Sequence, residues 1–187
     1  PGQTILIVGN AGPAMWRAFS KAREEGGPTT LDVWTQRILG PVAATFGARA
    51  IYPFDGPPYA PFMRWAMKAE PVHPSPINMT IHPEYGLWHA YRGAFVINER
   101  LALPALQTNR SPCLDCADRP CLSACPVDAF STATYEVDAC AVHVRDPAGA
   151  DCQSQGCRAR RACPIGQDFL YAPDQAAFHM AAFLKNN

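Results

Sequence analysis

The chain has no net charge and no cysteine outside one short stretch. Its 16 basic and 16 acidic residues balance, so charge gives no sign of a nucleic-acid ligand or a polybasic membrane surface. No run approaches the ~18 consecutive apolar residues of a membrane span. The first residues also lack the charged and apolar regions of a signal peptide. We therefore expect a cytoplasmic protein with no membrane span and no nucleic-acid partner.

The first part of the chain lacks a complete nucleotide-binding fingerprint. Residues 4–8 form a short apolar, β-branched run that predicts a buried strand, and residues 14–25 predict an amphipathic helix. A strand, a turn and a helix are the start of a dinucleotide-binding unit, but Gly9-x-x-Gly12 is not G-x-G-x-x-G. Pro13 also removes an N–H group that a phosphate would use. We interpret residues 9–13 as a strand-to-helix turn.

The remaining patterns predict an α+β domain over residues 1–108. Helices are expected at residues 31–46, kinked or split by Gly40-Pro41, and at residues 62–69. The apolar face of the longer helix is predicted to comprise Val33, Trp34, Ile38, Val42 and Phe46. A strand is expected at residues 48–54, and residues 77–81 and 87–98 are expected to pair as an antiparallel hairpin.

Residues 109–187 are expected to form a second, small and loop-rich domain. Prolines number 19 in the whole chain, about twice the usual share of roughly 5%. Short helical turns are expected near residues 122–124, 138–144 and 155–162. The last element, residues 174–185, has the pattern of an amphipathic helix whose apolar face packs on one of the two domains.

All eight cysteines lie within residues 113–163. They follow the patterns Cys113-x2-Cys116-x4-Cys121-x3-Cys125-Pro126, then Cys140, then Cys152-x4-Cys157-x5-Cys163-Pro164. A chain without an export signal uses such a run for metal binding more readily than for disulfides. Four thiolates hold one [4Fe–4S] cluster, so eight correspond to two clusters.

The spacing also predicts how the cysteines divide. In two-cluster ferredoxins, a C-x2-C-x2-C-x3-C-P run gives three ligands to one cluster, and its fourth cysteine ligates the other. The first run here is that pattern with two additional residues in its middle gap. The expected metal ligands are therefore Cys113, Cys116, Cys121 and Cys163 for one cluster, and Cys125, Cys140, Cys152 and Cys157 for the other.

Three alternatives remain open at this point. Structural zinc is typically held by paired C-x2-C knuckles, and this chain has a single C-x2-C. Four disulfides fit the count of cysteines but not the expected compartment. One cluster with spare thiols fits the long gap between Cys140 and Cys152, where His143 is a possible substitute ligand.

Three arginines, Arg158, Arg160 and Arg161, flank the last two cysteines. An all-cysteine [4Fe–4S] site carries a charge of about −2 when its thiolates are counted. We expect these arginines to offset that charge, to raise the reduction potential or to receive a docking partner.

The cysteine segment resembles the cluster domain of epoxyqueuosine reductases and reductive dehalogenases. The similarity rests on Cys113-Leu-Asp-Cys116, Pro120-Cys121-Leu-Ser-Ala-Cys125-Pro126, the lone Cys140 and Cys163-Pro164. Those enzymes pair two [4Fe–4S] clusters with a cobalamin. Their last run is a compact C-x2-C-x3-C-P, whereas this chain has gaps of four and five residues.

The first domain is similar to cobalamin-processing proteins of the CblC type, which have a modified nitroreductase-like fold. The similarity rests on Val8-Gly-Asn-Ala-Gly-Pro-Ala-Met-Trp16 and His82-Pro-Glu-Tyr-Gly-Leu-Trp-His-Ala-Tyr-Arg-Gly93. It implies a corrinoid pocket near residues 82–88. The cofactor-binding residues that it implies are His82, Tyr85, Gly86 and Trp88.

The sequence therefore predicts an α+β redox protein: a nitroreductase-like (CblC-type) domain followed by a dicluster ferredoxin module. It would pass single electrons through two [4Fe–4S] clusters and exchange them with a redox partner protein. The resemblance implies a cobalamin at the first domain and a corrinoid-dependent or corrinoid-reducing oxidoreductase. The alternative is a non-catalytic electron carrier whose first domain docks a partner enzyme, and a third reading is an interaction protein stapled by zinc.

Overall fold

The structure is a computed structural model of the 187-residue chain, and it describes residues 3–106, 110–131 and 134–187. The chain divides into two compact units. The first comprises Pro1–Pro71 and His89–Thr108, and the second comprises Val72–Trp88 and Asn109–Asn187. Helices and strands occur together, which confirms the expected α+β class.

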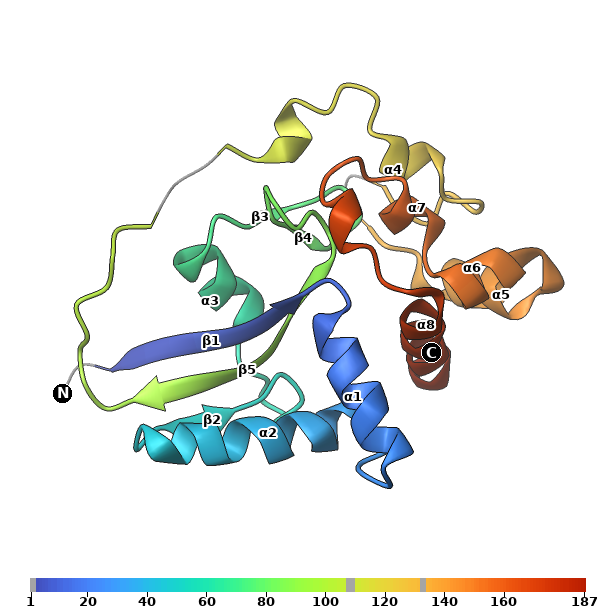
Figure 1. Cartoon of the computed structure of the whole chain (residues 1–187). Coiled ribbons are helices and arrows are strands. Elements are labelled where there is room, and N and C mark those ends of the chain that lie inside the picture. The colour runs from blue at the N-terminus through green and yellow to red at the C-terminus, as the bar shows by residue number, and fades with distance from the viewer. Residues whose placement is uncertain (1–2, 107–109, 132–133) are drawn as a thin grey trace. The chain divides into compact units, whose positions relative to one another are not determined.

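The first unit is built on a three-stranded antiparallel sheet (Figure 1). Strand β5 (His89–Ile97) lies between β1 (Thr4–Ala11) and β2 (Arg49–Ile51). The unit also contains helices α1 (Ala14–Glu24), α2 (Leu31–Thr45) and α3 (Phe62–Ala69). The three predicted helices of this region are therefore confirmed, with ends within one residue of those expected.

Helix α2 departs from its predicted form in two ways. The helix is continuous through Pro41, since proline removes only one backbone bond close to the carboxyl end. Its buried residues are Leu31, Thr35 and Ala43, whereas the expected apolar face includes exposed side chains such as Ile38 and Phe46. The prediction of that face was wrong because Thr35, a polar residue, faces inward by hydrogen-bonding the carbonyl of Leu31.

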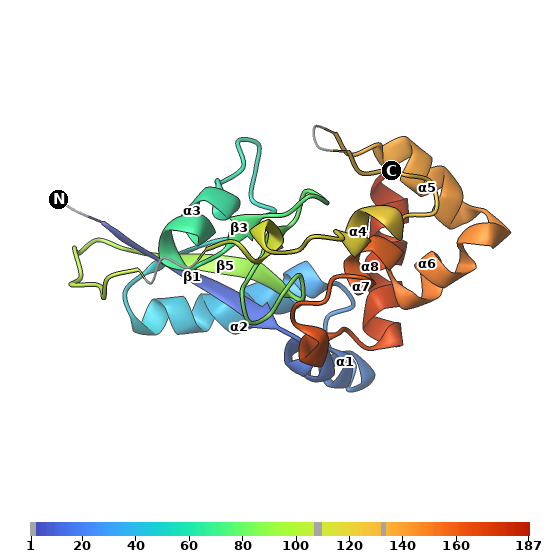
Figure 2. The same cartoon turned by 90° about the horizontal axis from the view of Figure 1, so that it is seen from above.

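The second unit contains five helices among its described residues: α4 (Pro120–Ser123), α5 (Val137–Arg145), α6 (Ala150–Gln155), α7 (Arg158–Arg161) and α8 (Pro173–Asn186). Helix α8 packs beside α6 and α5 (Figure 2). Single 3₁₀ turns occur at Pro112–Leu114, Pro147–Gly149 and Gln167–Phe169. No helix in the described part of the chain has the length and apolar character that crossing a membrane requires.

The predicted hairpin of residues 77–81 with 87–98 is wrong. Strand β4 (Thr80–Ile81) pairs with β3 (His73–Pro74), while β5 pairs with β1 and β2 of the first unit. A single bridge between His82 and Gly86 closes the turn before β5. Residues 77–81 and 87–98 therefore do not pair with each other as the two strands of a hairpin.

The reason is that residues 72–88 belong to the core of the second unit. Ile77, Ile81 and Leu87 are 2%, 2% and 1% exposed, and they pack with Cys125 and Cys163. The cysteine segment is poor in large apolar side chains of its own, so it completes its core with this earlier segment. Each unit is therefore made of two separate segments of the chain, whereas the sequence predicts two contiguous domains. The predicted boundary between residues 108 and 109 lies outside the described residues.

Candidate metal centre

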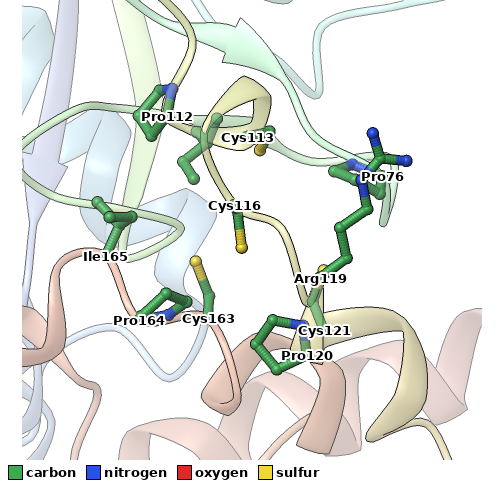
Figure 3. Close-up of a pocket in the computed structure, with 11 residues that line it drawn as sticks. Pro76, Pro112, Cys113, Cys116, Arg119, Pro120, Cys121, Cys163, Pro164 and Ile165 are labelled. Carbon is green, nitrogen blue, oxygen red and sulfur yellow. The ribbon is translucent and has the colours of Figure 1, made fainter.

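Four cysteines line one cavity of the second unit. They are Cys113, Cys116, Cys121 and Cys163. Figure 3 shows their sulfur atoms pointing toward a common space. Cys113 lies in the turn Pro112–Leu114, Cys121 in α4, and Cys163 follows α7. Three of these ligand candidates thus come from one run of the sequence, and the fourth comes from a position far along the chain.

The other four cysteines line a second cavity. They are Cys125, Cys140, Cys152 and Cys157. Cys140 lies in α5 and Cys152 in α6, while Cys157 directly precedes α7. The eight side chains are therefore grouped in the two sets that the spacing predicts, with Cys125 and Cys163 placed away from their sequence neighbours.

Two short helices account for this exchange of cysteines. Cys121 lies within α4 and Cys125 follows that helix, while Cys157 directly precedes α7 and Cys163 follows it. The two helices pack against each other. Cys125 and Cys163 each lie two residues after the end of one of these helices, and each lines the other cavity from the cysteine that begins its pair.

Burial raises the pKa of the Cys113, Cys121, Cys140, Cys157 and Cys163 thiols. Neighbouring cysteine sulfurs raise these pKa values further, because a second negative charge is unfavourable beside the first. A thiolate must form before a cysteine can bind a metal ion, so a metal ion bound here would displace protons. The two groups are therefore thiol-rich sites of low polarity.

Hydrogen-bond donors point at several of the sulfurs and favour their charged form. Tyr135 donates to Cys140 from its hydroxyl, and Ser111 interacts with Cys113. Backbone N–H groups of Ala159 and Arg160 donate to Cys157 at the start of α7. The backbone N–H of Ala129 donates to Cys125 Sγ over 3.3 Å, and that of Ile165 donates to Cys163. Such N–H and O–H donors are a principal means by which proteins set the potential of iron–sulfur sites.

All eight cysteines are free thiols. Within the described ranges, no group of three or more Cys, His, Asp or Glu side chains is placed so that it could hold one metal ion.

The three arginines expected to face the clusters have partners within the second unit. Arg158 and Arg161 both pair with Asp151. Arg160 donates from Nε and Nη2 to the carbonyl oxygen of Leu87, over 3.0 and 2.6 Å. These contacts attach α7 to its surroundings, so the arginines have a structural role in addition to any effect on cluster charge.

The turn of residues 82–88, where the resemblance implies corrinoid contacts, is packed within the second unit. His82 and Trp88 are 8% and 3% exposed. His82 stacks on Tyr85, with ring centroids 4.3 Å apart, and its Nδ1 accepts from the backbone N–H groups of Glu84 and Tyr85. Neither of the two cysteine-lined cavities includes these residues. The corrinoid contacts stay a prediction, and the observed contacts are those of a structural turn.

Gly86 is the residue at which this turn approaches the backbone of Ile165 most closely. Its φ of +57° is the left-handed conformation that glycine adopts readily, and a Cβ there would lie 1.9 Å from the carbonyl oxygen of Ile165. Gly166, with φ of +75°, packs reciprocally against the backbone of Tyr85. The backbone next to Cys163 therefore rests directly on the turn, and two glycines make this contact possible.

Two residues of the site were not identified from the sequence. Tyr135 and Ser111 each interact with a cysteine, but neither carries a metal-binding signature. Ser111 has a recognisable local signal, since a serine two residues before Cys113 accepts its backbone N–H over 3.4 Å. The path of the chain into α5 brings Tyr135 to Cys140, and the Tyr135 ring stacks on that of Phe130. No sequence pattern indicates this contact.

Comparisons with protein-family models, with curated proteins and with solved structures found no match to this chain.

Proposed function

We propose that the protein transfers single electrons through two [4Fe–4S] clusters. The observation that carries this proposal is the division of all eight cysteines into two cavities of four. The two sets are interleaved along the chain in the manner of two-cluster ferredoxins. Four thiols, little other polarity and several N–H donors are the surroundings in which such a cluster is bound.

Each part of the second unit has a separate task in this proposal. The cysteines provide the ligands, and the donors to sulfur stabilise the thiolate charge. The segment of residues 72–88 covers the site with Ile77, Ile81 and Leu87, and so limits the access of water to the sulfurs. When bound, the clusters supply one-electron chemistry, with potentials that depend on these hydrogen bonds and on burial.

Two features favour one electronic unit over two independent sites. Cys121 and Cys125 are joined through α4, and Cys157 and Cys163 through α7, so each helix connects one cavity to the other. The cysteines of both sites also share one apolar core, which includes Ala129 and Ala159. Electrons would enter at one site and leave at the other, toward a redox partner protein.

The test is anaerobic reconstitution with iron and sulfide followed by metal analysis. We expect about eight irons and eight sulfides per chain, broad absorption near 400 nm, and a paramagnetic signal after reduction by dithionite. A colourless protein that binds stoichiometric zinc in preference to iron would contradict the proposal. About four irons per chain would instead indicate one cluster, with four cysteines that bind no iron.

The same preparation tests the corrinoid that the resemblance implies. Cobalamin is added to the reduced protein, and its absorption is followed. A change in the spectrum that saturates with protein supports a corrinoid-reducing role. An unchanged spectrum supports the carrier that has no catalytic activity of its own.

A further inference from the structure

One arginine lies at the first cysteine cavity. We call the four cysteines of that cavity the first set: Cys113, Cys116, Cys121 and Cys163. Arg119 lines the same cavity, and Figure 3 shows its side chain running along the edge, from beside Cys121 toward Pro76. Arg119 and Cys113 also line an adjoining open cavity of about 430 Å³. The arginine therefore lies on the side of the first set that faces solvent.

The charge of Arg119 is not compensated by a carboxylate. Among the residues that the structure describes, none pairs with its guanidinium. Asp115 of the same segment is paired with Arg110 over 3.4 Å, and Asp118 is exposed. Burial raises the pKa of the Cys113 thiol, and the Arg119 charge opposes that rise. The positive charge thus acts on at least one sulfur of the first set.

The three arginines near the last two cysteines are placed differently. The lining of the first cavity contains none of them, and Arg119 is its one basic side chain among the described residues. Arg158 lines the second cavity, but it pairs with Asp151 over 3.7 Å. Arg161 pairs with the same carboxylate, and Arg160 donates to a backbone carbonyl. Arg119 is therefore the arginine that the first set faces.

The backbone at position 119 is unfavourable for an arginine. Its φ and ψ are +40° and +55°, in the left-handed region, and Pro120 follows directly. Glycine adopts the left-handed region readily, whereas other residues do so at a cost. A residue before proline also normally adopts an extended backbone. Because residues held in such conformations cluster at functional sites, the arginine side chain itself points to a role.

We propose that Arg119 raises the reduction potential of the cluster that the first set binds. This inference rests on the proposed function and adds which charge tunes which site. Reduction makes a cluster more negative by one charge, so a nearby positive charge stabilises the reduced form. A guanidinium stays charged throughout the working pH range and has no lone pair to offer a metal. Arg119 thus acts through its field and not as a ligand.

The test is a redox titration of the anaerobic, reconstituted protein, followed by electron paramagnetic resonance. Arg119→Gln removes the charge. Reduction of one cluster should become about three- to tenfold less favourable, which is about 30–60 mV at 59 mV per tenfold. Arg119→Lys keeps the charge and should keep most of the wild-type potential. The difference between wild type and Arg119→Gln should shrink in 1 M potassium chloride, because salt screens an exposed charge.

The matched control is Arg145→Gln. This variant removes the same charge from an arginine of the second unit that donates to the carbonyl of Leu184 over 3.0 Å. Arg145 lines neither cysteine cavity. Its replacement should therefore move either potential much less than Arg119→Gln does.

Two cysteine backgrounds assign the shift to one cluster. Cys140→Ser with Cys152→Ser removes ligands of the second cavity and leaves the first set intact. Adding Arg119→Gln to this background should lower the remaining potential as in the complete protein. Cys116→Ser with Cys163→Ser removes ligands of the first set, and Arg119→Gln should then have little effect on the remaining potential.

Arg119→Gly separates the charge from the backbone. It removes the charge and also suits the left-handed conformation. The potential should fall as it does in Arg119→Gln, while the midpoint of urea unfolding should lie above that of Arg119→Gln. A purely structural role would instead link the potential to stability, so that the more stable variant keeps the wild-type potential.

The proposal is overturned if Arg119→Gln moves neither potential, or if the shift persists after the first set has lost its ligands. It is also overturned if Arg145→Gln gives an equal shift, because any charge of the unit would then have the same effect. Iron analysis separates these failures from failure of the proposed function. Eight irons with unshifted potentials overturn the role of Arg119 alone, whereas a chain that binds no iron overturns both.

Discussion

Arg160 provides the sharpest test of how the cysteine segment is held together. It lies in α7, between Cys157 and Cys163. Its guanidinium donates twice to the carbonyl of Leu87. The same group lies 4.4 Å from the ring centroids of both Trp88 and Tyr171. We consider Arg160→Met, which keeps the length and helix propensity of the side chain but removes the charge and the donors.

The magnitude follows from these contacts. The charged hydrogen bonds to one buried carbonyl contribute about 1.5–3 kcal/mol, and each cation–π contact about 0.5–1 kcal/mol at a partly exposed position. Methionine keeps part of the apolar contact with the two rings. We therefore expect Arg160→Met to lower the free energy of unfolding by about 2–4 kcal/mol. Arg160→Lys should recover less than half of this, because a lysine cannot donate twice and stack at once.

The assay is urea unfolding of the anaerobic, cluster-loaded protein, followed by far-ultraviolet circular dichroism. With a slope of about 2 kcal/mol per molar urea, the midpoint should fall by about 1–2 M. The matched control is Arg158→Met on the same helix, whose 3.7 Å ion pair with Asp151 is exposed. That variant should cost less than about 1 kcal/mol. Equal midpoints for Arg160→Met and Arg158→Met would refute the reasoning.

Three further predictions concern the turn, a sulfur donor and the first unit. Gly86→Ala should cost more than about 3 kcal/mol by urea unfolding, because its Cβ meets backbone. Gly47→Ala, which has the same φ of +57° in open space, should cost only about 1–2 kcal/mol; similar losses would contradict this. Tyr135→Phe removes a hydrogen bond to Cys140, so one midpoint potential should fall in a redox titration, and an unchanged pair of potentials would remove this role. Burial, followed by the nearby Glu70 carboxylate, raises the pKa of Tyr91 above its usual 10.0. The folded chain therefore keeps a proton that the unfolded chain releases, and stability should fall above about pH 10 more steeply in the wild type than in Tyr91→Phe. Parallel pH profiles for these two proteins would contradict that assignment.

The helices of the first unit could be predicted because their ends carry local signals. Thr30 caps α2 by accepting the N–H of Val33 over 3.4 Å, and proline precedes both α1 and α3. These signals depend on a few adjacent residues, so the sequence alone reveals them. The same is true of the two cysteine sets, whose division follows from the spacing of the cysteines along the chain.

The elements that were missed depend on contacts distant in the sequence. Ile77, Ile81 and Leu87 have the local pattern of a strand, but their burial against Cys125 and Cys163 determines their position. Helix α6 has no apolar periodicity, and its place beside α8 and α5 supports it instead. The role of Gly86 could not be predicted either, because the backbone that it contacts, at Ile165, is distant from it in the sequence.

The turn predicted at residues 9–13 illustrates the same limit in the first unit. The sequence places Asn10 in a glycine-containing turn, and that interpretation was wrong because β1 continues through it to Ala11. Pairing with β5, with a register shift between Val8 and Gly9, extends the strand. This pairing joins residues about 80 positions apart, so no local pattern indicates it.

The central claim is that the eight cysteines form two interleaved sets, and iron content in two double variants tests it most directly. Cys116→Ser with Cys163→Ser removes two ligands from one proposed set. Cys157→Ser with Cys163→Ser removes neighbours in sequence that belong to different sets. After anaerobic reconstitution, the first variant should keep about four irons per chain, and the second should keep almost none. The reverse result would show that each cluster is held by four consecutive cysteines and would contradict the account.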